Sequence, residues 1–304
     1  MSTIEKALNA MKAKQKLAQQ GQPESEAQTA TATSASESSV VVPQGGQTET
    51  LQIQEQQLDE LGMITTSASA RRIRDEFRNI KLKLLTNAFG SGAASHKNGN
   101  LIMVSSANPN EGKTFTAINL ALSIALEKDK TVLLVDADVL KPSVMNTFEI
   151  PPKKGLMEYL SGEVNSVADV IYPTTIDNLR VMPAGMPHDL SNELLTSEKM
   201  MVLAQELAER YTDRVVVFDC PPLIGINETQ VLARLVGQVI VVVEQDKTKM
   251  SEVKDAIKDL DRDLAIGFVV NKMVRGAFSN SGYGYGYGYG YGHNESNAEK
   301  DKRS

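Results

Sequence analysis

Residues 107–114 read Ala107-Asn108-Pro109-Asn110-Glu111-Gly112-Lys113-Thr114, and this stretch decides the fold of the chain. The apolar run Leu101-Ile102-Met103-Val104 precedes it, and an apolar pattern with helical spacing follows it to about Glu127. A strand, a tight loop ending in Gly-Lys-Thr and a helix are the context of a phosphate-binding loop. Because backbone N–H groups at the start of a helix bind phosphate oxygens, the stretch predicts a nucleotide site.

The side chains of Lys113 and Thr114 fit the chemistry of such a loop. The lysine would neutralise charge on the β- and γ-phosphates, and the threonine hydroxyl would bind Mg²⁺. One position departs from the usual pattern GxxxxGK(S/T), because Ala107 stands where the first glycine is expected. Short matches of this kind are common by chance, so the prediction needs support from other parts of the chain.

Three aspartates give that support, because each follows an apolar run. Asp136 and Asp138 follow residues 131–135, and Asp219 ends the run of residues 215–218. If these strands are neighbours, the three carboxylates converge beside the phosphates, where they can hold Mg²⁺ and accept a proton. A single aspartate after a strand is usually a turn residue, but three beside a phosphate loop favour an acidic site.

The remaining apolar runs predict the architecture. They alternate with longer amphipathic stretches such as residues 190–210 and 251–262. Continuous runs rich in β-branched residues between amphipathic helices are typical of a mostly parallel sheet with helices on both faces. We therefore predict the α/β fold of a P-loop NTPase, in which ligands bind beyond the carboxyl ends of the strands. The further runs are residues 179–182, 214–218, 238–243 and 266–270.

Composition divides the chain of 304 residues into three parts. Residues 1–66 are poor in aromatic residues and rich in Gln, Ser, Thr, Ala and Glu, so we predict a disordered leader and linker. Residues 67–275 are predicted to form the P-loop domain, and residues 276–304 a flexible tail. Within the leader, the weak apolar stripe of residues 1–20 predicts either an amphipathic helix for a membrane or partner, or a partly formed helix.

The net charge of −6 argues against non-specific nucleic-acid binding as the main activity. The single cysteine, Cys220, excludes a disulfide within the chain and fits a reducing compartment. The N-terminus shows no signal-peptide core, and no apolar run reaches the ~18 residues that a transmembrane helix needs. We therefore expect a cytoplasmic protein that is held at a membrane only through a partner.

The tail holds five of the eight tyrosines of the chain, and only glycine separates them. Glycine at every second position disfavours a stable strand, and flexibility would let several phenols reach one active site. A nucleotide site and a row of phenols in one polypeptide suggest a kinase that acts on its own kind, whereas a low-complexity sticky tail is the alternative. The predicted phosphate acceptors are Tyr283, Tyr285, Tyr287, Tyr289 and Tyr291.

Taken together, the three apolar residues before Asp136-Ala137-Asp138, the phosphate loop and the strand ending at Asp219 resemble the bacterial tyrosine kinases (BY-kinases). These enzymes are relatives of partition and septum-site ATPases and are unrelated to eukaryotic kinases. The chain is most similar to the tyrosine autokinases of exopolysaccharide/PEP-CTERM (exosortase) loci, over roughly residues 70–275 and the tyrosine tail. The segments that carry this likeness are residues 87–90, 100–104, 111–121, 134–138, 183–185, 193–195, 213–222 and 237–239.

The resemblance implies a protein-tyrosine kinase that uses ATP and Mg²⁺ and phosphorylates the tail of a neighbouring copy. Lys113 and Thr114 would then serve the phosphates and Mg²⁺. Asp219 would support Mg²⁺ together with Asp138, and Asp136 would be the base that takes the phenolic proton. Catalysis is thus assigned to Lys113, Asp136 and Asp138. The other nucleotide-binding candidates are Asn110, Glu111, Gly112, Phe115 and Asn271, of which Asn271 either reads the adenine edge or is a turn residue.

The family carries Glu-x-x-Arg-x-x-Arg in a helix that packs against the neighbouring subunit of a ring. Here the corresponding residues are Asp75, Arg78 and Lys81, in a helical pattern over residues 70–88. Their i, i+3 spacing places all three near one face, which is either that interface or a solvated face with local ion pairs. The chain departs from the family at Leu140, where an arginine is usual.

The family also implies partners. Copies of the chain would form a homo-oligomeric ring, with an octamer among the candidate sizes, in which each tail enters the next subunit's site. A separate membrane polysaccharide co-polymerase would activate the kinase, because the chain lacks spanning segments. A cognate phosphotyrosine phosphatase would reverse its action. The kinase would then regulate exopolysaccharide polymerisation or export, peripheral to the inner membrane.

Two other interpretations remain open. A partition- or septum-type ATPase usually carries a signature lysine early in the phosphate loop, where this chain has Asn108, and lacks a tyrosine tail. A non-enzymatic, nucleotide-gated scaffold would explain the departures at Ala107 and Leu140. The intact Lys113 and the three aspartates argue against the scaffold.

Overall fold

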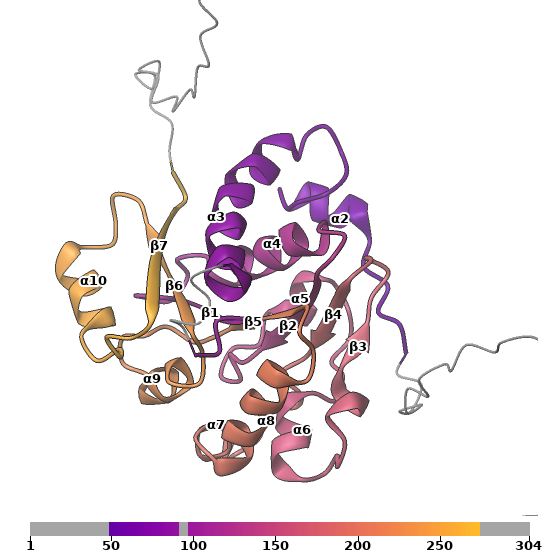
Figure 1. Cartoon of the computed structure of the whole chain (residues 1–304), viewed down its shortest axis with the longest axis vertical. Coiled ribbons are helices and arrows are strands. Elements are labelled where there is room, and N and C mark those ends of the chain that lie inside the picture. The colour runs from indigo at the N-terminus through magenta and orange to yellow at the C-terminus, as the bar shows by residue number, and fades with distance from the viewer. Residues whose placement is uncertain (1–48, 91–96, 274–304) are drawn as a thin grey trace, which may run out of the picture. The chain divides into compact units, whose positions relative to one another are not determined.

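A seven-stranded sheet forms the centre of the computed structural model, which describes residues 49–90 and 97–273 (Figure 1). The strand order is β3-β4-β2-β5-β1-β6-β7. β3 runs antiparallel to β4, and every other pair of neighbours is parallel. The strands are β1 (Leu101–Ser106), β2 (Thr131–Asp136), β3 (Tyr172–Pro173), β4 (Leu179–Met182), β5 (Arg214–Asp219), β6 (Gln238–Glu244) and β7 (Ala265–Asn271).

Helices cover both faces of this sheet (Figure 1). α3 and α4 pack on one face together with α2 and α5, and α6 to α10 pack on the other. The predicted α/β fold with a mostly parallel sheet is therefore confirmed. The helices are α2 (Glu55–Glu60), α3 (Arg71–Phe89), α4 (Lys113–Ala125), α5 (Val144–Thr147), α6 (Leu156–Ser161), the 3₁₀-helix η2 (Val167–Val170), α7 (Ser191–Leu195), α8 (Glu198–Glu209), α9 (Asn227–Ala233) and α10 (Met250–Ile257).

The central strands are buried along their whole length, which explains their continuous apolar sequences. In β1, Leu101 and Met103 belong to the core under α6 to α10, whereas Ile102 and Val104 belong to the core under α3 and α4. Successive side chains of a strand point to opposite faces, so a strand between two helical layers must be apolar at every position. Burying each such side chain contributes about 1.5–3 kcal/mol to folding.

Two element boundaries differ from the prediction. The helical stretch expected over residues 190–210 is divided into α7 and α8. Ser197 stands between them, and its side chain accepts a hydrogen bond from the Met200 N–H, which caps the start of α8. The antiparallel strand β3 was not predicted, because its two residues carry no periodicity that a sequence pattern could reveal.

Residues 49–66, which we call the N-terminal strap, correct the predicted boundary of the leader. Leu51 bridges to the end of β3 by accepting a hydrogen bond from the Thr175 N–H and donating to the Pro173 carbonyl. The Ile64 N–H donates to Asn119 Oδ1 on α4 at 2.8 Å. The strap is ordered because it buries apolar side chains against the α3–α4 core, and these are Leu51, Ile53, Leu58, Met63 and Ile64.

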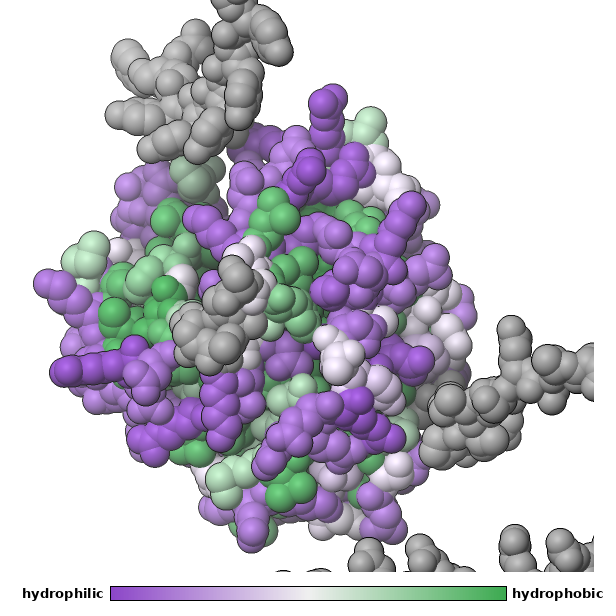
Figure 2. Space-filling model, viewed as in Figure 1, coloured by the Kyte–Doolittle hydropathy of each residue, from purple (hydrophilic) through white to green (hydrophobic). Residues whose placement is uncertain are grey.

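The strand β7 forms one edge of the sheet and is less covered than the others. Phe268 and Val270 are half-exposed on it. Figure 2 shows hydrophobic residues gathered over this edge of the molecule. The other edge, at β4, is protected by the short antiparallel β3 and by the strap.

The predicted amphipathic helix of residues 1–20 and the tyrosine tail lie outside the described residues. Within the described ranges, none of the helices combines the length and the apolar character that a membrane crossing requires.

Candidate active site

The phosphate loop lies between the carboxyl end of β1 and the start of α4, as predicted. Asn110 and Gly112 have positive φ angles of 66° and 98°. A Cβ atom at Gly112 would lie 2.0 Å from Asn271 Nδ2, so both the conformation and the available space require glycine there. Ala107 does not have a positive φ, so the loop adopts this shape without a glycine at its first position.

Side chains at the end of β7 and in the segments after β6 and β7 contact the loop. Glu111 is buried, accepts a hydrogen bond from the Asn108 N–H at 2.8 Å and accepts another from the Thr248 hydroxyl. Asn271 Nδ2 donates to the Glu111 carbonyl at 2.9 Å, and Lys272 Nζ donates to the Asn110 carbonyl at 2.6 Å. The amide of Asn271 is therefore bound to the loop in this structure.

Lys113, at the first position of α4, is buried between two carboxylates. Its Nζ lies 2.5 Å from Asp138 Oδ2 and 3.7 Å from Asp219 Oδ1. Burial alone would lower the pKa of the ammonium, but the negative charges of Asp219 and Asp138 outweigh it and raise the pKa. The lysine is thus held charged and positioned at the mouth of the phosphate loop.

The predicted convergence of the aspartates depends on strands β2 and β5 being neighbours, and they are. Asp136 and Asp219 stand directly opposite each other at the carboxyl ends of these strands. Asp219 Oδ2 accepts a hydrogen bond from the Thr114 hydroxyl at 2.7 Å. Burial raises the pKa of Asp219 to about 6, although Lys113 and Thr114 favour its charged form.

Asp136 is fully buried and holds the backbone that follows β2. Its Oδ1 accepts from the Asp138 N–H at 3.2 Å, and its Oδ2 accepts from the N–H groups of Ser143 and Val144 at 3.1 and 3.0 Å. Burial and the charge of Asp219 raise the pKa of Asp136 to about 7. In this structure Asp136 shapes the segment 137–144, and it is Asp138 that faces the cavity.

A cavity of about 490 Å³ opens beside the phosphate loop. Four of the predicted nucleotide-binding residues line it, namely Asn110, Gly112, Lys113 and Thr114, whereas Glu111, Phe115 and Asn271 do not. Phe115 instead packs against the α3–α4 core. The lining residues that the sequence analysis did not assign to nucleotide binding are Pro109, Leu140, Lys141, Ser143, Pro222, Ile224 and Ile226.

Lys141 and Ser143 extend the polar side of this cavity. The Lys141 N–H donates to Asp138 Oδ1 at 3.1 Å, and its Nζ lies 3.4 Å from Asn110 Oδ1. The hydroxyl of Ser143 lies 3.2 Å from that of Thr114. Lys141 thus brings a positive charge to this cavity. The only feature of the sequence that could have indicated a role for Lys141 at the site is its position three residues after Asp138.

Thr114, Asp138 and Asp219 fit Mg²⁺ as a set of oxygen donors. Mg²⁺ is usually bound through one or two carboxylates, while waters and phosphate oxygens complete its shell. Asp219 Oδ1 is buried without a hydrogen-bond partner, and its ion pair with Lys113 Nζ is 3.7 Å long, so this carboxylate oxygen retains the capacity to accept a metal ion. Over residues 49–90 and 97–273, no group of three or more His, Cys, Asp or Glu side chains is arranged as a metal site by itself.

Comparison with known proteins identifies the family. The model of the AAA domain family matches residues 99–263. The tyrosine-protein kinase YwqD of Bacillus subtilis (strain 168) is 32% identical over 184 residues, which cover 60% of this chain and 76% of YwqD. The chain belongs to the bacterial tyrosine kinases. The crystal structure of the chimerical protein CapA2B2 is similar to this one, with a TM-score of 0.59 and 25% identity over 75% of this chain and 96% of that chain.

The bacterial tyrosine kinases that resemble this chain differ in length. The tyrosine-protein kinase ptk of Acinetobacter johnsonii is 32% identical over 193 residues, which cover 63% of this chain. The chain spans only 25% of the length of ptk and 30% of the length of the putative tyrosine-protein kinase EpsB of Ralstonia nicotianae, to which it is 30% identical. The activity, substrates and partners of the whole protein are therefore taken up as proposals.

Helix α3, the candidate interface of this tyrosine kinase, presents two of the three predicted residues. Asp75 and Arg78 are exposed. Lys81 is buried, with its Nζ 3.1 Å from the Ser123 carbonyl and 2.5 Å from Glu127 Oε1, so its predicted place at a subunit interface is corrected. The six positions from Asp75 to Lys81 turn a helical side chain by about 600°, a net change of about 120° around the helix axis, so Lys81 lies on the side of α3 that faces α4.

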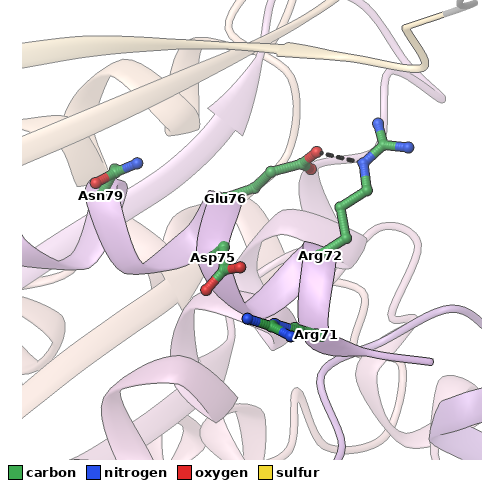
Figure 3. A pocket seen from close by; sticks show the side chains of 5 residues that line it. All are labelled: Arg71, Arg72, Asp75, Glu76 and Asn79. Atoms are coloured by element: carbon green, nitrogen blue, oxygen red, sulfur yellow. Dashed lines mark hydrogen bonds and ion pairs between the residues drawn. The ribbon is translucent and has the colours of Figure 1, made fainter. Parts of the chain in front are cut away.

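The exposed face of α3 contains a charged hollow of about 390 Å³ (Figure 3). Arg72 Nε forms an ion pair with Glu76 Oε1 at 2.9 Å within it. Both signs of charge therefore lie side by side on this face. The side chains that line the hollow are Arg71, Arg72, Asp75, Glu76 and Asn79.

Proposed function

We propose that this chain is an ATP-dependent protein-tyrosine autokinase that transfers phosphate to the tyrosines of residues 283–291. The observation that carries the proposal is the meeting of Lys113 with Asp138 and Asp219 beside the cavity, in a member of the bacterial tyrosine kinases. A second observation supports the tail as substrate. The Lys272 side chain contacts the phosphate loop, and the first tail tyrosine follows only eleven positions later in the sequence.

The chain's own groups supply binding and positioning. The loop N–H groups and Lys113 would bind the phosphates, and the charged ammonium would offset charge that develops on the transferred group. Thr114, Asp138 and Asp219 would hold Mg²⁺, which adds positive charge at the phosphate oxygens. The apolar side chains of Ile224 and Ile226 would limit water on the far side of the cavity.

Asp136 remains the proposed base for the phenolic proton. A pKa of about 7 suits proton exchange at neutral pH. Its carboxylate has no exposed surface, so it can accept that proton only after the segment 137–144 moves. The positioning of the phenol and the positive charges around the phosphates would carry most of the rate.

Self-association through α3 is part of the proposal. Copies would form a ring, with an octamer as one size, and each tail would enter the site of the next copy. A membrane polysaccharide co-polymerase would activate the kinase at the inner membrane, and a phosphotyrosine phosphatase would reset it. The output would be control of exopolysaccharide polymerisation or export.

The test of the activity is mass spectrometry of the purified chain after incubation with Mg²⁺ and ATP. We expect phosphate on residues 283–291 of the wild type and at least a hundredfold less on Lys113→Met, because the variant loses the cation that binds the phosphates. Lys128→Met, an exposed lysine outside the site, is the matched control and should behave as the wild type. Equal phosphorylation of wild type and Lys113→Met would exclude this site as the source.

Transfer between copies is tested by mixing two variants. One is Lys113→Met with its tyrosines intact, and the other keeps Lys113 but has phenylalanine at all five tail tyrosines. Phosphate on the tail of the Lys113→Met copy establishes transfer in trans. If neither variant is phosphorylated in the mixture while the wild type is, transfer takes place within one chain.

A further inference from the structure

Tyr211 is the only exposed tyrosine among the residues that the structure describes. It is 40% exposed, whereas Tyr159 and Tyr172 are each 8% exposed. It lies in the short connection between α8 and β5, where Arg210 and Thr212 are exposed as well. Within the described part of the chain, its hydroxyl has no hydrogen-bond partner. The phenol is therefore accessible to an enzyme.

Arginines surround this tyrosine. The guanidinium carbon of Arg214 lies 3.8 Å from the centre of the Tyr211 ring, and that of Arg210 lies 5.7 Å from it. Arg214 is buried, yet its Nε has no hydrogen-bond partner. Leaving a buried donor unpaired costs free energy, and a planar guanidinium matches phosphate oxygens well. The structure thus holds an unused donor of the kind that binds phosphate, directly beside an accessible phenol.

The charge around Arg214 also favours an anion. Burial lowers the pKa of Arg214, and the positive charges of Arg180 and Arg210 lower it further, against the opposing influence of Tyr211 and Asp213. Arg210 is partly neutralised, because its Nη1 pairs with Glu206 Oε1 at 2.6 Å. A phosphate group here would relieve repulsion between the arginines while it accepts hydrogen bonds from Arg214.

We propose that Tyr211 is a further site of tyrosine phosphorylation, and that Arg214 binds the phosphate once it is attached. The proposal rests on the kinase activity proposed above. The phenol oxygen of Tyr211 forms a bond to the γ-phosphorus of ATP, the bond from that phosphorus to its bridging oxygen breaks, and ADP leaves with the electron pair. The phenolic proton passes to a carboxylate of the active site that catalyses the transfer.

The phosphate donor must be bound to another copy of the chain. Tyr211 lies before β5, and Asp219 ends the same strand beside the phosphate loop. Six residues of a strand span roughly 17 Å at ~3.3 Å per residue. Tyr211 therefore lies at the opposite end of the sheet from its own active site, and transfer has to take place in trans.

Tyr159 provides an internal control. A lysine, Lys199, lies 4.7 Å from the centre of its ring, so both tyrosines have a cation at the ring face. Tyr159 is buried, and burial raises the pKa of its phenol. Accessibility, rather than a neighbouring cation alone, should decide which of the two accepts phosphate.

The first experiment uses ¹⁵N-labelled Lys113→Met chain as acceptor and unlabelled wild type as donor, with Mg²⁺ and ATP. We expect labelled peptides that carry phosphate on Tyr211 and none on Tyr159 or Tyr172. Phosphate on the labelled tail with Tyr211 unmodified would overturn the inference and leave the proposed function standing. The absence of phosphate from every peptide of donor and acceptor would overturn both.

The second experiment tests the arginine contact with a tyrosine phosphatase on the phosphorylated chain. Phosphate on Tyr211 should be removed several-fold more slowly than phosphate on residues 283–291, because Arg214 binds it. Arg214→Lys keeps the charge but loses the planar donor and should abolish that delay. If this variant does not fold, Arg180→Gln with Arg210→Gln, both at exposed positions, should shorten the delay. Equal removal rates at Tyr211 and the tail in the wild type would contradict the contact.

Discussion

Asp136 and Asp219 oppose each other at the ends of two neighbouring strands, with neither carboxylate exposed. Burying two negative charges is unfavourable, and this burial is the main reason why the pKa values of about 7 and about 6 lie well above the ordinary 3.8. The charge of Asp219 adds to the increase at Asp136. Lys113 relieves only part of this cost. The site is thus built to receive positive charge, which Mg²⁺ would bring with the nucleotide.

At the residue scale we predict that the stability of the nucleotide-free chain falls as pH rises. Between about pH 4 and 7 the folded state binds more protons at Asp136 and Asp219 than the unfolded state does, so the free energy of unfolding is highest at the acidic end. The loss should be on the order of 2 kcal/mol between pH 5 and 8. Urea unfolding at a series of pH values measures it.

The matched variant is Asp136→Asn, which keeps the shape of the side chain and removes its titration. It should unfold more easily at acidic pH, because an amide accepts fewer of the three N–H donors, and its stability should vary less with pH. An unchanged pH slope in Asp136→Asn would show that this carboxylate is not the group that titrates.

The sequence was sufficient to predict the position of site residues that lie at or just after the carboxyl end of a strand. Lys113, Asp136, Asp138 and Asp219 all lie where the motif predicted, because parallel strands bring their carboxyl ends to one edge. The contacts of Glu111 were not predictable, since its partner Thr248 is 137 positions away and carries no motif. The contact between the Asn271 amide and the loop was not predictable either, because only the fold brings the two together.

At the scale of elements, the N-terminal strap shows how a few apolar residues can order a polar segment. Its buried side chains are separated by glutamines, threonines and glutamates, so no helical or strand period stands out. The composition of residues 49–66 resembles that of residues 1–48 before it. The strap is ordered because its apolar side chains fit the α3–α4 core. The sequence of the strap alone does not reveal that fit.

We predict that a chain beginning at residue 67 is much less stable than one beginning at residue 49. The shorter chain loses five buried apolar side chains, each worth about 1.5–3 kcal/mol, and exposes the core beneath them. Thermal unfolding should show a difference on the order of 10 °C or more. A comparable melting temperature for the two chains would mean that the strap contributes no stability.

At the scale of the whole molecule, α3 has two faces: one packs against α4, and the exposed one is the proposed interface between copies of the chain. Arg78 is exposed, whereas Lys81 is buried against α4. We predict that Arg78→Glu lowers the mass of the oligomer in solution without changing the melting temperature, because the substitution alters only surface charge. Lys81→Met should instead lower the melting temperature, because it leaves Glu127 without its partner. Light scattering and thermal unfolding of both variants give the two readouts.

Phosphorylation should act on the same assembly. Five phosphotyrosines would add roughly −7 to −10 charges within nine residues at neutral pH. Such tails would repel one another and the acidic site, so we expect the oligomer to dissociate as phosphate accumulates. Equal mass of the oligomer before and after exhaustive dephosphorylation would contradict this.

For the interface prediction above, an oligomer of unchanged mass in Arg78→Glu would exclude α3 as the interface.

Because Lys272, just after β7, contacts the phosphate loop, the residues that follow it begin beside the candidate active site. Nine residues lie between Met273 and Tyr283, so the two can be at most about 36 Å apart. In the proposed reaction, the local concentration of each phenol at a given active site would depend on its distance along the chain from residue 273. Added or deleted glycines before Tyr283 would shift which tyrosines are modified first. We therefore expect the length of residues 274–282 to influence which tyrosine accepts phosphate first.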